Sequence, residues 1–429
     1  MFAARTRFLA LCAALLATPV VGADEYNFDV GQFEKKAFEF GGYAELRAEH
    51  FRLDTDAALY QLNFFDREPI TEYNAGIGAL QLEGLYRQGI SSFRFVGYGT
   101  YADDYSGSVS DARVYEAYLT LAPSDRATFD LGKKTLSWGK GYAFNPVGFV
   151  QRMKDPNDPE LAREGYVIAG GNVIRSFEGP LKTVAFTALV VPTSDRVNED
   201  FGPGDYANPA AKLTLLYLDT DIDLLVLGEG ARSARYGFDF SRNLGTNIEI
   251  HGEWAHLTET TRPVVSATGM VTTVTQSANN YLLGARYLTE NDLTAIVEYY
   301  YNGAGYSEDE ARTFFQTIHN AYDAGNTALL ERLRIAAQTA LARPNSMQRY
   351  LYLRLSQKDP FDILYFTPAL TVIANLDDGS SSVSPELLYT GVTNLELRLR
   401  VFFLTGGQLT DFGERQNDRR LELRARYYF

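Results

Sequence analysis

Histidines and carboxylates that could form a catalytic or metal-binding site are few in this chain. The sequence has 4 histidines. One of them, His251, lies between Glu249 and Glu253 at alternate positions, which places the three side chains on the same face of a strand. A histidine flanked by carboxylates could bind a metal ion, but the same residues would equally make the polar face of a strand. We favour the polar face and predict no catalytic residue, no metal site and no cofactor.

The remaining histidines, His50, His256 and His319, form no recognisable arrangement with a serine and a carboxylate. A hydrolase could still assemble its site from residues of several strands, so an enzyme is kept as a less favoured alternative. The acidic run that contains Asp155 and Asp158 offers oxygen ligands for a divalent cation, but it lacks the spacing and the glycine of a calcium-binding loop. We therefore interpret this run as a solvated turn.

The elements that must position these residues are predicted to be strands. The segment from Leu421 to Phe429 alternates apolar and charged side chains up to a terminal aromatic. About eighteen segments of this kind occur, and many are longer than the strands of soluble sandwiches. Strands of about ten residues, apolar outside and polar inside, are what a transmembrane β-barrel requires. The predicted strands are 38–53, 76–87, 91–102, 112–121, 127–138, 171–178, 182–192, 210–218, 222–229, 233–242, 247–257, 276–288, 293–301, 346–356, 361–374, 381–389, 394–404 and 418–429.

The connections alternate between tight turns and long loops, which is the topology of an all-β, antiparallel up-and-down barrel whose turns face the periplasm. An even number of strands then places both termini in the periplasm. The two longest predicted loops are 139–170 and 302–345. We predict a single barrel domain over 38–429, preceded by a periplasmic segment over 24–37. A mean hydropathy of −0.20 leaves no room for several apolar transmembrane helices.

Residues 1–23 predict a secretory signal peptide. Two arginines precede a short apolar run, Phe8 to Ala17, and small residues end at Ala23 before Asp24. The single cysteine, Cys12, lies in this segment, so the mature chain would have no disulfide, thiol nucleophile or cysteine-ligated metal. The net charge of −14 argues against a nucleic-acid partner.

The signal peptide, the aromatic end of the last strand and the stretch from Gly132 to Gly139 resemble features of the porins and specific channels of bacterial outer membranes. The stretch reads GKKTLSWG and is similar to a Gly-basic-polar-x-x-x-Trp-Gly pattern of large outer-membrane barrels, among them, more loosely, the alginate-export barrels. The resemblance implies an outer-membrane location, contact with membrane lipid, and recognition of Tyr427 and Phe429 by the barrel-assembly machinery. It does not identify a solute.

Alternation also predicts which side chains face the lumen of the barrel. Basic residues exceed acidic ones on strands seventeen, eighteen and one, and acidic residues exceed basic ones on strands eleven to thirteen. Opposite charges on neighbouring strands should mostly pair, and any imbalance that is left would set a field across the lumen. The predicted pore-lining residues are Glu45, Arg47, Glu49, Glu249, His251, Glu253, Arg286, Glu298, Glu396, Arg398, Arg400, Arg420, Glu422, Arg424 and Arg426.

The loop 139–170 carries an apolar load that would be costly to leave in water. We predict that it folds into the lumen and narrows the pore, with a surface cap as the competing placement. Folding inward should bring its charged residues to face the arginines of strands seventeen, eighteen and one. The residues expected at the constriction are Trp138, Tyr142, Phe144, Arg152, Asp155, Asp158 and Arg163.

The loop 302–345 differs in kind, because its pattern is helical. Ser307 and Glu310 have the spacing of a capping box, and one apolar stripe follows on each side of Gly325. We predict a helical hairpin in this external loop. Its stripes could cover each other, or they could serve as a lid or as a docking surface for a partner.

Together these features predict a porin-like channel for passive or substrate-selective diffusion of small polar or charged solutes. A barrel of about eighteen strands has an aqueous lumen unless loops fill it, which favours this function. Two alternatives belong to other classes. One is a scaffold in an export or electron-conduit complex with a periplasmic or surface protein partner, and the less favoured one is an outer-membrane hydrolase.

Overall fold

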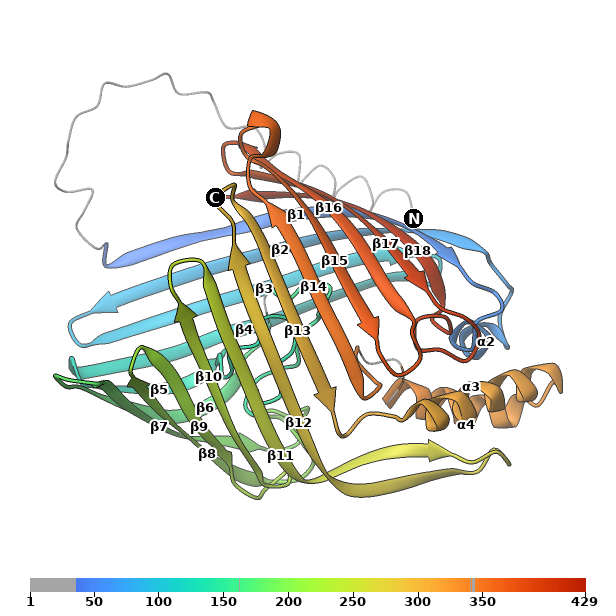
Figure 1. Ribbon diagram of the computed structural model, residues 1–429, viewed down its shortest axis with the longest axis horizontal. Helices are drawn as coiled ribbons and strands as arrows, with labels where there is room; N and C mark the ends of the chain where they lie inside the picture. Colours follow the sequence, from blue (N-terminus) through green and yellow to red (C-terminus); the bar gives the residue numbers. More distant parts are fainter. Residues whose placement is uncertain (1–35, 162, 340, 342–343) are drawn as a thin grey trace.

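The computed structural model describes residues 36–161, 163–339, 341 and 344–429, and these form a closed β-barrel (Figure 1). Its 18 strands pair antiparallel with their neighbours along the chain, and β1 (Phe38–Leu53) closes the barrel against β18 (Asn417–Tyr428). The predicted fold class is therefore confirmed. The predicted signal peptide, 1–23, lies outside the described residues.

Every predicted strand overlaps one strand of the structure. The strands between β1 and β18 are β2 (Glu72–Gln88), β3 (Ser91–Asp104), β4 (Gly107–Ser124), β5 (Ala127–Lys134), β6 (Tyr166–Ser176), β7 (Leu181–Thr193), β8 (Tyr206–Tyr217), β9 (Thr220–Leu227), β10 (Arg235–Leu244), β11 (Ile248–Val265), β12 (Val271–Leu288), β13 (Leu293–Asn302), β14 (Arg349–Gln357), β15 (Phe366–Asn375), β16 (Ser381–Val392) and β17 (Leu395–Thr405).

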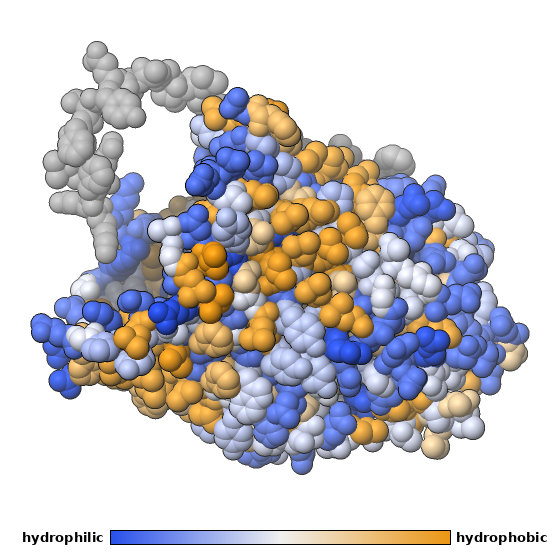
Figure 2. Space-filling view, viewed as in Figure 1, coloured by the Kyte–Doolittle hydropathy of each residue, from blue (hydrophilic) through white to orange (hydrophobic). Residues whose placement is uncertain are grey.

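The two faces of the wall differ in chemistry, as alternation predicts. Leu46, Leu397 and Leu423 are exposed on the outer face, whereas Glu45 and Glu422 are buried on the inner face. Apolar residues gather over the strand wall, and polar residues gather toward the end that carries the helices (Figure 2). An apolar outside and a polar inside are what a barrel needs in order to sit in lipid. We call the end with the helices the helix end, and the end with the short connections the turn end.

Three helices lie at the helix end: α2 (Ala58–Phe64), α3 (Glu308–Asp323) and α4 (Thr327–Thr339). The predicted hairpin is confirmed as α3 and α4, and Ser307 caps α3 as expected, accepting a hydrogen bond from Glu310 N while Glu310 Oε2 accepts one from Ser307 N. Helix α2 was not predicted. Its first N–H groups are satisfied by Glu414, which lies far away in the sequence, so no local capping signal precedes it. In the part of the chain that the structure describes, no helix is long and apolar enough to cross a membrane.

Two boundaries differ from the sequence prediction in ways that matter for the site. Strand β5 ends at Lys134 and β6 begins at Tyr166, so the long connection between them is 135–165 rather than 139–170. The second difference is that β11 and β12 extend to Val265 and Val271 and project beyond the rim as a hairpin (Figure 1). This extension forms because it packs against α3, where Arg262 pairs with Glu310 at 2.7 Å.

One buried apolar cluster joins the helices to the inside of the barrel. It combines Phe314 of α3 and Leu333 of α4 with Phe144 of the 135–165 connection and Tyr350 of β14. Most of the two stripes of the hairpin is thus covered by the molecule itself, and Tyr322, at the end of the first stripe, is exposed. The hairpin lies over the helix end and packs against the 135–165 connection inside the barrel.

Candidate functional site

The 135–165 connection, which we call the inward segment, contacts strands on widely separated parts of the inner wall. Backbone N–H groups near its start bind Glu253 of β11 and Glu298 of β13. Near its far end, Asp158 pairs with Arg424 of β18 at 3.1 Å. Since these strands lie apart in the closed barrel, the segment crosses the interior.

Glu253 is the first anchor of the inward segment. Its Oε1 accepts hydrogen bonds from Lys140 N at 2.6 Å and Gly141 N at 2.5 Å, and its Oε2 accepts one from Val147 N at 3.2 Å. Gly139 makes this approach possible, because its φ is +98° and a Cβ there would lie 2.7 Å from the Glu253 carboxylate. The glycine of the sequence pattern therefore serves the contact between segment and wall.

Glu298 is the second anchor. It accepts hydrogen bonds from the backbone N–H groups of Tyr142, Ala143 (2.8 Å) and Phe144 (3.4 Å), and it also bonds His251 Nε2 at 2.9 Å. His251 is thus a partner of Glu298, while Glu249 lies 3.7 Å from its other ring nitrogen. No group of three or more potential metal ligands occurs among the described residues.

Apolar packing holds the body of the segment. Phe149 and Val150, both about 1% exposed, pack in one cluster with Trp138 and with Ile168 and Leu225 of the wall. The ring of Phe144 stacks on Tyr300 of β13 with centroids 4.6 Å apart. The apolar load of the segment is buried inside the barrel.

The tip of the segment is held by three arginines of the opposite wall. Asp158 lies 3.1 Å from Arg424, and 3.9 Å from both Arg398 and Arg400 of β17. Burial works against the ionised form of Asp158, but the three guanidiniums outweigh it and hold its pKa below the usual range. Arg400 also donates to the backbone oxygen of Asn157 at 3.1 Å.

Around this tip, the predicted pore-lining charges of β1, β17 and β18 pair closely. Two residues that the sequence prediction missed belong to the same network: Glu386 of β16, which bonds Arg400, and Arg354 of β14, which bonds Glu386. Both residues could have been predicted from the same alternation of polar and apolar side chains. Further pairs are Arg47, Arg424 and Arg426 with Glu45, Arg420 with Glu49, Arg424 with Glu422, and Arg398 with Glu396 and Glu386.

Several predicted site residues lie elsewhere. Arg152 does not face the wall arginines as expected, because it pairs with Glu164 at 3.3 Å and with Asp200. Arg163 donates to the backbone oxygen of Arg152 at 3.2 Å, and Asp155 closes a turn by accepting from Asn157 N at 2.9 Å. Arg286 of β12 lies opposite Glu249, on the inner face as predicted, and is exposed there. Of the charged residues predicted to meet the arginines, Asp158 is the one that forms ion pairs with them within the part of the chain that the structure describes.

A polar cavity of about 560 Å³ separates the inward segment from the base of the hairpin. Five basic side chains line it, against one carboxylate, that of Asp200; the basic residues are Arg152, Lys154, Arg232, Arg235 and Arg262. Arg232 donates to the backbone oxygens of Phe149 and Phe201 at 3.0 and 2.5 Å, and burial lowers its pKa. Within the described ranges, no carboxylate forms an ion pair with Arg232 or Arg235, two residues that sequence analysis did not single out.

Comparisons with known proteins bear on this architecture. No protein-family model matches the chain, and no curated protein matches it in sequence. Among solved structures, the chain is similar to OccAB1 of Acinetobacter baumannii, with a TM-score of 0.50 and 12% identity over 91% of this chain and 96% of that chain. The chain has the fold of an outer-membrane porin.

Two further structures are more distant. OccK7 (OpdD) of Pseudomonas aeruginosa gives a TM-score of 0.48 and 12% identity over 91% of this chain and 98% of that one. An engineered Rhodopseudomonas blastica porin gives 0.41 and 9%, over 91% and 100%. The barrel fold that the sequence indicates is confirmed by the likeness to OccAB1.

Proposed function

We propose that the protein is an outer-membrane channel for diffusion of small polar or charged solutes, constricted by the inward segment. The observation that carries this proposal is the double anchoring of the segment, by Glu253 and Glu298 on one side and by Arg424 on the other. A segment that is fixed to both sides of a lumen reduces the cross-section through which a solute can pass. Both termini would then lie in the periplasm.

The cavity above the segment supports a preference for anions. Arg232 and Lys154 are bonded to backbone oxygens rather than to carboxylates. The charges of Glu253 and Glu298 act on Lys154, whereas Arg232 forms no ion pair within the described residues. Burial lowers the pKa of Lys154, and an arriving anion would favour its charged form. Anionic solutes should therefore concentrate in this cavity before they reach the constriction.

Conductance measurements in planar bilayers test the channel. Replacement of residues 143–161 by a short Gly/Ser linker should raise the single-channel conductance, because it removes the crossing segment and leaves all the strands. A matched control shortens the tip 266–270 between β11 and β12, which projects beyond the rim, and should leave conductance unchanged. Equal conductance of the linker variant and the unaltered chain would refute a constriction at this segment.

The two alternative functions, a scaffold and a hydrolase, predict other results and need other structural features. A scaffold would conduct only with a co-purified partner, and the apolar stripes of the hairpin, which would offer the docking surface, are already mostly covered within the molecule. A hydrolase would need a nucleophile beside a histidine, and among the described residues the ring nitrogens of the four histidines bond amide or carboxylate side chains, not a hydroxyl. The channel is the function that these contacts support best.

A further inference from the structure

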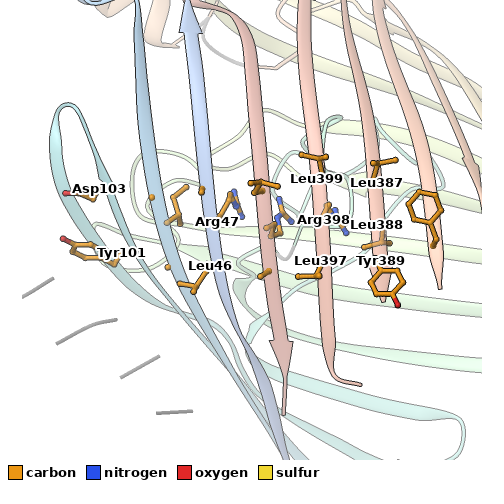
Figure 3. A pocket seen from close by; sticks show the side chains of 18 residues that line it. Leu46, Arg47, Tyr101, Asp103, Leu387, Leu388, Tyr389, Leu397, Arg398 and Leu399 are labelled. Atoms are coloured by element: carbon orange, nitrogen blue, oxygen red, sulfur yellow. The ribbon is translucent and has the colours of Figure 1, made fainter. Parts of the chain in front are cut away.

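A groove of about 840 Å³ runs along the outer face of the barrel (Figure 3). It crosses seven neighbouring strands, from β3 through β2, β1, β18, β17 and β16 to the start of β15. The cross-strand register places its outward-facing members in two adjoining rows. In one row Ala48 lies between Gly76 and Leu423, and in the other Leu46 lies between Gly78 and Ala425. Since their neighbours in sequence, Arg47, Arg398 and Arg424, belong to the inner charge network, both rows face outward.

The groove exists because its floor is made of small residues. Ala48 of β1 lies opposite Gly76 of β2, and Ala425 of β18 lies opposite Leu46, two residues away along β1. A Cβ added at Gly76 would have nothing within 4 Å, so the space above the floor is open. Exposed leucines, Leu46 and Leu397 among them, form the sides.

The length and direction of the groove fit a membrane component. Strands lie about 4.8 Å apart, so a row across seven of them extends about 29 Å. One end of the groove lies at Asp103, the penultimate residue of β3, which is near the helix end. The other end lies at Phe366, the first residue of β15, which is near the turn end. The row therefore runs obliquely across most of the wall, which is more than the roughly 15 Å depth of one hydrocarbon leaflet.

We infer that this groove holds an acyl chain of a tightly bound membrane lipid. The groove is continuous with the exposed apolar face of the barrel, so hydrocarbon is what surrounds it in the proposed location. A second copy of the barrel would present a pleated wall that cannot follow a narrow oblique concavity, whereas a flexible chain can fill it. The inference rests on the membrane location in the proposed function but not on conduction.

Native mass spectrometry of the full chain tests this inference. The protein is extracted from vesicles of phosphatidylethanolamine and phosphatidylglycerol, and the phospholipid that each barrel retains is counted. The unaltered chain should retain phospholipid, and Gly76→Leu, which fills the groove, should lose at least one molecule. Gly84→Leu is the matched control, because it lies on the outer face of the same strand but does not line the groove.

Ala425→Leu fills the groove from β18 and gives a second route should Gly76→Leu fail to fold. Retention of the same number of phospholipids by the filled variants, or none by the unaltered chain, would overturn the inference. A change from oligomer to monomer without loss of lipid would also overturn it, and would assign the groove to a second copy. Because the groove lies outside the lumen, conductance should be the same in all these variants, so the channel proposal stands or falls separately.

Discussion

Single carboxylates fix the position of the inward segment. Glu298 accepts hydrogen bonds from three consecutive backbone N–H groups and bonds His251, while it is fully buried. We expect Glu298→Ala to destabilise the packed segment by about 3 to 5 kcal/mol, because it leaves buried donors without an acceptor. Conductance traces should become noisier and larger on average.

The control for this change is Glu249→Ala on β11, the strand that carries His251. Glu249 lies 3.7 Å from His251 and its side chain is one-third exposed, so its loss removes a charge of the same sign without releasing the segment. If both variants gave the same traces as the unaltered chain, the carboxylate of Glu298 would not be what holds the segment.

Asp158 neutralises part of an arginine cluster that faces the lumen. Asp158→Asn keeps the shape of the tip but removes the charge that Arg398, Arg400 and Arg424 share. A unit charge at 4 Å contributes about 1 kcal/mol in water-like surroundings, so the anion-to-cation permeability ratio should rise about fivefold. Reversal potentials in a salt gradient measure the ratio. Asp155→Asn, in the same turn, should shift it less.

At the scale of elements, three segments of the helix end meet at one histidine. His319 of α3 faces the side-chain oxygen of Gln61 in α2 at 3.0 Å and Glu414 at 2.9 Å. With an acceptor at each ring nitrogen, the contacts suit the doubly protonated ring. The hydrogen bond to Glu414 raises the pKa of His319, burial opposes this, and the charges of Glu414, Asp323 and Asp56 add to the increase.

The contact of His319 predicts that the packing of α3 against α2 depends on pH. Because the pKa of His319 is higher in the folded state, its contribution to stability is fully present below about pH 6.5, the unfolded value, and is lost as pH rises through the folded value. Hydrogen exchange of α3 and α2 should therefore accelerate from pH 6 to pH 9, beyond the intrinsic increase. His319→Gln should abolish the excess, and an excess that persists in this variant would place the titrating group elsewhere.

Elements also show what the sequence can and cannot predict. Strands were predictable because alternation is local, and the capping box at Ser307 is local too. Helix α2 and the cavity arginines were not, because Glu414 and the partners of Arg232 come from distant segments. Strand β5 ends four residues earlier than predicted. Residues 135–138 continue the alternation, but Thr135 and Trp138 bond the side chains of Glu116 and Gln151 and the backbone oxygen of Arg163 instead of continuing the backbone ladder.

At the scale of the whole molecule, closure depends on the seam between β1 and β18. Phe429 N and Gly42 O bond at 3.1 Å, as do Gly42 N and Phe429 O, and the ring of Phe429 lies 6.4 Å from that of Phe40. The register continues from Tyr43 opposite Tyr428 along most of both strands. The last residue therefore contributes only the final pair of hydrogen bonds to a long seam.

This geometry separates two roles that Phe429 could have in assembly. Removal of Phe429 should lower the free energy of unfolding of the purified barrel by only about 1 to 3 kcal/mol, the value of two backbone hydrogen bonds. If the assembly machinery reads the terminal aromatic, as we propose, the yield of heat-modifiable barrel in outer-membrane fractions should fall far more than this loss explains. Phe361→Glu is the control. Phe361 is 88% exposed in a turn, so this substitution removes an aromatic side chain for which no role is expected. Normal yield of the truncated chain would show that Phe429 acts through the seam alone.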